Sequence, residues 1–139
     1  MPDGTPTGGG PGSGVRRRWR SRRVVVRDDS MRPEFEPGDH LYVDPRSGRS
    51  LERGDVVAAR DPERPDRLLL KRVAALAGEP RPDGGVVPPG SVYLLGDRAD
   101  ASRDSRSFGP VPLAALVGVV WFRYAPGARR GPVPVDTFK

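Results

Sequence analysis

From residue 24 onward, the chain is a series of short apolar runs separated by turn residues. Val, Leu and Ala dominate the runs, while Gly, Pro and Asp fill the gaps between them. The runs lie at residues 24–27, 41–43, 55–60, 68–77, 91–95 and 117–124. Runs of this length and punctuation are typical of β-strands. They predict one mainly β domain over residues 24–126, with a helix expected only at residues 112–116, where Pro112 suits a first helical turn.

The two ends of the chain have a different composition. Gly, Pro, Thr and Ser dominate residues 1–14, which predicts disorder. Residues 16–23 carry six arginines, so this segment accounts for most of the net charge of +6. A basic groove in the domain is therefore not implied. We expect residues 1–23 to form a disordered tail, first Gly/Pro-rich and then Arg-rich, and residues 127–139 to form an extended C-terminal tail.

The absence of cysteine and the scarcity of histidine limit the chemistry. The chain has no Cys and a single histidine, His40. These counts exclude disulfides, thiolate metal sites, a cysteine nucleophile and multi-histidine metal sites. We expect no metal and no cofactor. A Ser-His-Asp triad would have to use His40, so a hydrolase built on this chain is expected to use another base.

Lys71 differs from the other interior cations, all of which are arginines. A buried lysine can lose its proton, whereas arginine keeps its charge. In a strand over residues 68–77, Lys71 shares a face with Leu69 and Val73, while Arg72 points to the opposite face. Apolar surroundings lower the pKa of an ammonium group, and a neutral amine can take a proton from a serine hydroxyl. The alternative is an edge-strand lysine whose ammonium reaches water.

Two polar segments lie beside the predicted strands. Ser30 follows the first strand and precedes a bend at Pro33, where main-chain N–H groups could stabilise an oxyanion. A serine that caps a turn is the alternative. The segment at residues 96–106 lies between two apolar runs and is dense in Asp, Ser and Arg. Such a segment is either a loop that builds a site or an ordinary surface loop.

Together these segments resemble the signal peptidase I family. Four blocks typical of that family occur in order, at residues 30–39, 53–57, 70–79 and 96–111. The first begins Ser30-Met31, the third begins Leu70-Lys71, and the fourth begins Gly96. The resemblance implies a single signal peptidase I/LexA-like catalytic β domain. It also implies a serine endopeptidase that cleaves after small residues, typically Ala-any-Ala.

The resemblance assigns a role to each matching residue. Ser30 matches the nucleophile, whose own N–H supplies one oxyanion donor, and Lys71 matches the general base. Three supporting residues follow from the same match: Ser102, whose hydroxyl orients the lysine amine, and the ion pair of Asp104 and Arg106. Met31 matches a residue that lines the substrate cleft.

The chain departs from the family at three points. Asp28 stands where the family often has Gly or a hydroxyl residue, and a carboxylate beside a developing oxyanion opposes catalysis. Arg98 replaces a common Asn. No apolar run approaches the roughly 20 residues needed to span a bilayer. We therefore expect a cytoplasmic or membrane-peripheral location. A soluble subgroup of similar length, which removes a leader from nickel-type superoxide dismutase, fits these features.

Three functions remain open at this stage. The first is a leader-removing endopeptidase, monomeric, whose partner is a protein substrate with an N-terminal leader or signal peptide. The second is a self-cleaving regulator of the LexA type, which shares the dyad but needs a DNA-binding domain before residue 24. The third is a non-catalytic β module that binds a partner or an anionic surface through its basic tail. Residues 16–23 suit anionic lipid, and no specific nucleic-acid contact is expected.

Overall fold

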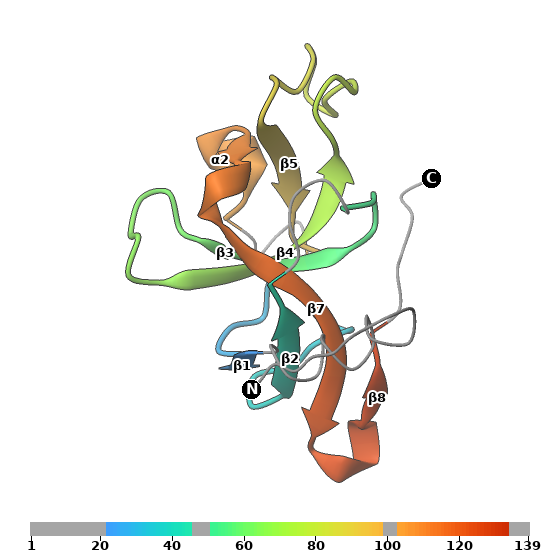
Figure 1. Cartoon of the computed structure of the whole chain (residues 1–139). Coiled ribbons are helices and arrows are strands. Elements are labelled where there is room, and N and C mark those ends of the chain that lie inside the picture. Colours follow the sequence, from blue (N-terminus) through green and yellow to red (C-terminus); the bar gives the residue numbers. More distant parts are fainter. Residues whose placement is uncertain (1–21, 46–50, 99–102, 134–139) are drawn as a thin grey trace, which may run out of the picture.

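The structure is a computed structural model that describes residues 22–45, 51–98 and 103–133, and it is mainly β, as predicted (Figure 1). One eight-stranded sheet has the order β1-β2-β7-β3-β4-β5-β6, with β8 also paired to β7. Every strand pair is antiparallel. The strands are β1 (Arg22–Val25), β2 (His40–Asp44), β3 (Val56–Arg60), β4 (Leu68–Ala75), β5 (Ser91–Leu95), β6 (Val111–Pro112), β7 (Leu116–Ala125) and β8 (Gly131–Pro132).

Strand β7 connects the two parts of the sheet. Its first residues pair with β3 and its later residues pair with β2, and Figure 1 shows it running between these two regions. Gly118 lies where the partner changes. A Cβ atom at this position would lie 2.2 Å from the carbonyl oxygen of Asp44. Glycine is therefore required here, because any side chain would collide with the main chain of β2.

Strand β3 contributes to two hydrophobic cores, because alternate residues of a strand face opposite sides. Val56 and Ala58 belong to the first core, which also holds residues 31 and 35 of the turn that carries Ser30. Val57 and Ala59 belong to the second, which also holds Val73 of β4. All four β3 residues in these cores are at most 1% exposed. The apolar run of β3 thus supports both the turn of the candidate nucleophile and the strand of the candidate base.

The short helical elements differ from the sequence expectations. The helix expected at residues 112–116 is a single 3-10 turn, η3 (Leu113–Ala115). A one-turn helix, α2 (Ser105–Phe108), lies in the polar segment, where none was predicted. Part of the expected C-terminal tail forms η4 (Gly127–Arg129) and strand β8. Strand β1 begins at Arg22 rather than at residue 24.

The remaining residues of both predicted tails, 1–21 and 134–139, lie outside the described residues. Among the residues that the structure describes, no helix is long and apolar enough to cross a membrane.

Candidate active site

Ser30 lies in a tight turn that follows β1 and is anchored in the first core. The N–H of Arg32 donates to the carbonyl of Asp29 at 3.1 Å, and the N–H of Phe35 donates to the carbonyl of Met31 at 2.9 Å. Met31 and Phe35 are at most 1% exposed, so their side chains anchor the turn in the first core. Ser30 itself is 3% exposed and lines a cleft of about 840 Å³.

Asp28 accepts both polar hydrogens of Ser30. Its Oδ1 atom lies 3.1 Å from the Ser30 nitrogen and 3.0 Å from the Ser30 hydroxyl oxygen. The carboxylate therefore does not point away from the nucleophile. The N–H that the family resemblance assigns to the oxyanion is already engaged by a negatively charged acceptor.

Lys71 lies in β4 and lines the same cleft as Ser30. Its side chain is among the fully buried ones, with the residue 2% exposed. Burial lowers the pKa of Lys71 below its ordinary value of 10.5, although the negative charges of Asp28 and Asp104 oppose this shift. Leu69, which the strand pattern placed on the same face as Lys71, lines the same cleft, and so does Leu70 of β4.

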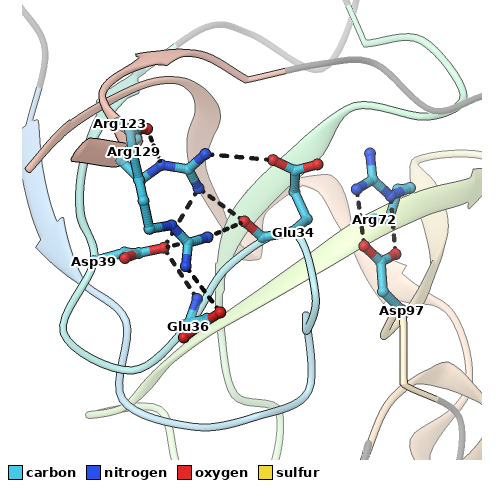
Figure 2. Close-up of polar contacts among 7 residues, drawn as sticks. All are labelled: Glu34, Glu36, Asp39, Arg72, Asp97, Arg123 and Arg129. Carbon is cyan, nitrogen blue, oxygen red and sulfur yellow. Dashed lines mark hydrogen bonds and ion pairs between the residues drawn. The ribbon is translucent and has the colours of Figure 1, made fainter. Parts of the chain in front are cut away.

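Arg72 is buried and is not among the residues that line the cleft; Figure 2 shows its guanidinium against the carboxylate of Asp97. Its guanidinium makes two parallel bonds of 2.9 Å to the carboxylate of Asp97 and a third bond of 2.8 Å to the carbonyl of Gly54. Bidentate pairs of this kind fix both distance and orientation. Sequence analysis missed this pair. The available signal was two adjacent cations in an apolar strand, of which the second needs an acidic partner.

The segment held by Arg72 also contacts the nucleophile turn. The N–H of Asp97 donates to Sδ of Met31 at 3.4 Å, and the N–H of Arg98 donates to the carbonyl of Ser30 at 2.9 Å. A continuous path therefore runs from Arg72, the neighbour of Lys71, to the main chain of Ser30. This path fixes the relative position of β4 and the turn.

Asp104 and Arg106 form the ion pair that the resemblance implied. Asp104 is fully buried, and its oxygens accept bonds from the Arg106 guanidinium at 2.9 and 2.5 Å and from the Gly96 N–H at 2.9 Å. Burial raises the pKa of Asp104, but the bonds from Arg106 and Gly96 outweigh it, so the pKa lies below its ordinary value. Asp104 also caps α2. Ser102, the predicted lysine-orienting residue, lies outside the described residues.

Arg103 also lines the cleft, and sequence analysis did not single it out. Its guanidinium pairs with the buried carboxylate of Asp61 and lies 2.7 Å from a carboxylate oxygen of Glu63. Both acids belong to the turn between β3 and β4. The positive charge of Arg103 adds to the lowering of the Lys71 pKa.

A second arginine network anchors the chain just after the nucleophile turn (Figure 2). Arg123 of β7 and Arg129 of η4 both donate to the carbonyl of Glu34, at 2.8 and 2.9 Å. Both also lie within 3.4 Å of Oδ2 of the buried Asp39. β7 and η4 thereby hold the chain that follows Ser30.

Main-chain edges of two strands border the cleft. β1 is the end strand of the sheet, and residues 23–28 line the cleft. β4 pairs with β5 only over Arg72–Ala75, and its earlier residues 68–71 line the same cleft. Within the described ranges, neither edge has a further strand partner. An extended peptide can therefore pair with these edges and pass Ser30 and Lys71.

The sequence matches the family described as signal peptidase, peptidase S26, over residues 15–80 and 79–125. Several similar proteins carry protease names. Mitochondrial inner membrane protease subunit 1 of Xenopus tropicalis is 36% identical over 121 residues, which cover 79% of this chain and 72% of that protein. Mitochondrial ATP-independent inner membrane protease subunit 1b of Arabidopsis thaliana is 35% identical, with 75% and 70% covered. Mitochondrial inner membrane protease subunit 2 of Schizosaccharomyces pombe is 33% identical, with 83% and 71% covered.

Proposed function

The chain belongs to the signal peptidase family, peptidase S26, and we propose that it is a Ser/Lys-dyad endopeptidase that removes an N-terminal leader or signal peptide after small residues. One observation carries the proposal. Ser30 and Lys71, from distant parts of the sequence, are both almost fully buried and line one cleft. Burial lowers the pKa of Lys71, which is what a lysine base requires.

In the proposed mechanism, the Ser30 oxygen attacks the scissile carbonyl carbon while the neutral Lys71 amine takes the hydroxyl proton. The tetrahedral intermediate collapses, and the resulting ammonium returns that proton to the leaving amine. A water molecule then attacks the acyl-enzyme, with its proton passing to Lys71. Hydrolysis releases the leader carboxylate and restores the Ser30 hydroxyl.

The two strand edges support a peptide substrate, since an extended chain can add to both β1 and β4 by main-chain hydrogen bonds. Met31 belongs to the residues that line the cleft. Its Sδ atom accepts the bond from Asp97, so the Met31 side chain has a fixed position beside the nucleophile. Asp104 and Arg106 would support the site by holding the Gly96 main chain.

The test is mass spectrometry of a leader peptide with an Ala-any-Ala site after incubation with wild type, Ser30→Ala or Lys71→Arg. Lys71→Arg keeps the positive charge and removes the base. Cleavage after a small residue by wild type alone is the expected result. Equal cleavage by all three proteins would assign the activity to other residues and overturn the dyad.

The bonds between Asp28 and Ser30 favour a second candidate, a non-catalytic β module that binds an anionic surface through residues 16–23. Its signature would be the absence of cleavage by all three proteins, together with binding to vesicles containing phosphatidylserine. Deleting residues 1–21, which leaves β1 whole, should then sharply weaken binding, and salt should weaken it. The same vesicle assay tests peripheral membrane contact for an active peptidase. Action on nickel-type superoxide dismutase and the monomeric state stay predictions.

A further inference from the structure

Both polar hydrogens of the candidate nucleophile go to one oxygen atom. Oδ1 of Asp28 lies 3.1 Å from the Ser30 nitrogen and 3.0 Å from the Ser30 hydroxyl oxygen. Asp28 is exposed and lines the cleft, whereas Ser30 is buried. The carboxylate therefore lies between the hydrogen-bonding groups of Ser30 and the space that a substrate enters.

This arrangement opposes acylation in two ways. An oxyanion donor has to lie about 2.7–3.1 Å from the developing negative oxygen. Oδ1 of Asp28 already lies 3.1 Å from the Ser30 nitrogen, so it occupies the position that the oxyanion would take. A carboxylate at that position also repels a second negative oxygen. In addition, the Ser30 hydroxyl proton is directed to Asp28, and the hydroxyl has to turn before it can transfer that proton to Lys71.

Asp28 also acts on the base. Its negative charge raises the pKa of Lys71 against the effect of burial and so favours the ammonium form. Asp104 acts in the same direction, but Asp104 has its own cation in Arg106. Arg103, which lowers the pKa of Lys71, is paired with Asp61. Movement of Asp28 away from the site would therefore favour the neutral amine.

We propose that Asp28 is a lock on the nucleophile: its carboxylate occupies the oxyanion position in the resting enzyme, and the substrate carbonyl has to displace it before acylation. The proposal rests on the proposed function of Ser30. Because Asp28 is exposed, its carboxylate can rotate into water without losing hydration. The lock limits reaction with chance electrophiles until a peptide paired with the strand edges forces its carbonyl into the site.

The test compares wild type with Asp28→Gly and Asp28→Asn. Asp29→Asn is the matched control, because it removes the same charge from the adjacent residue, whose carboxylate pairs with Arg32 at 2.8 Å on the surface. Removal of one oxyanion donor typically slows acylation by about 10²–10³-fold. Freeing that donor in Asp28→Gly should therefore raise kcat/KM for the leader peptide by at least about tenfold. Asp28→Asn, which keeps an acceptor without the charge, should give a smaller increase.

Labelling of Ser30 by a small fluorophosphonate, followed by mass spectrometry, should accelerate in the same order. The Ser30 amide proton in an NMR spectrum provides a readout independent of activity. A bond to a carboxylate shifts this proton downfield, so its signal should move upfield in Asp28→Gly and stay in place in Asp29→Asn.

Three results would overturn the lock. Slower cleavage and labelling by both Asp28 variants, with Asp29→Asn unchanged, would mean that the carboxylate assists the reaction. Equal rates in wild type and Asp28→Gly would mean that it does not obstruct the site. If neither wild type nor any of the variants cleaves the peptide or is labelled at Ser30, the proposed function fails instead. In that case, an unmoved Ser30 amide signal would still reject the contact on which the lock depends.

Discussion

The ion pair between Arg72 and Asp97 has an exposed counterpart of the same geometry, which permits a matched experiment on the support of the active site. Arg81 and Asp83 also make two parallel bonds of 2.9 Å between the same atom types. The Arg72 and Asp97 side chains are 2% and 15% exposed, whereas those of Arg81 and Asp83 are 26% and 38% exposed. The two pairs therefore share their bond geometry and differ in burial and in the sequence separation that they bridge, 25 residues for Arg72 and Asp97 and two for Arg81 and Asp83.

The change is Asp97→Asn, which keeps the shape and removes the charge. Breaking a buried pair by removing one partner costs about 3–5 kcal/mol, because the other charge stays buried without compensation. For a domain of this size, even 3 kcal/mol corresponds to a fall in Tm of roughly 12–24 °C. Asp83→Asn should leave Tm almost unchanged, because exposed pairs contribute little.

The assay is thermal unfolding followed by circular dichroism, which gives Tm, and urea unfolding compared at constant slope gives the free energy of unfolding. Peptide cleavage by Asp97→Asn should also fall at temperatures where the variant is folded, since Arg98 and Asp97 hold the Ser30 turn. If Asp97→Asn loses no more stability than Asp83→Asn, the inference that this buried pair holds β4 against the turn is wrong.

Three further predictions concern packing and protonation. Gly118→Ala should lower the free energy of unfolding by about 1–3 kcal/mol or more, because its Cβ meets the Asp44 carbonyl, whereas Gly127→Ala, with open space around it, should have little effect in the same melts. Cleavage by wild type should rise with pH as Lys71 loses its proton, with a midpoint below 10.5. The folded state holds this proton less tightly than the unfolded state, so the free energy of unfolding should also rise with pH between the folded pKa and 10.5. Lys71→Met should be more stable than wild type at neutral pH and should lack this rise. The pKa of Asp104 is lowered on folding, so its contribution to stability should be present at neutral pH and be lost as the pH falls through its folded value; Asp104→Asn should remove this part of the acid transition in pH-dependent melts.

The strands could be predicted from the sequence because their signals are local. Most runs of Val, Leu and Ala have Gly or Pro close to at least one end. The placement of Lys71 on one face of its strand and Arg72 on the other follows from strand alternation alone. The helix at residues 112–116 was overestimated, since a run this short closes only one 3-10 turn. The pairing of β8 with β7 depends on contacts between segments and has no signal in Gly131 and Pro132 themselves.

The site could be predicted as a set of residues but not as an arrangement. The order of the motifs predicted Ser30 and Lys71 as site residues, and both line one cleft in the structure. The partner of Arg72 could not be chosen from the sequence, because many aspartates were available and only the fold brings Asp97 to it. The sequence showed that Asp28 departs from the family pattern. It could not show where the carboxylate points, because a rotation of one side chain decides whether Asp28 contacts Ser30 or water.

The open edges that border the cleft have a consequence for the behaviour of the protein in concentrated solution. An unpaired strand edge is a template for any other strand, including one from a second copy of the chain. Arg22 and Arg23 are exposed on β1, and their like charges keep two such edges apart. Salt shortens the range of that repulsion to about 8 Å at physiological ionic strength. Concentrated, salt-rich preparations should therefore pair edge to edge, cover their own clefts and recover activity on dilution.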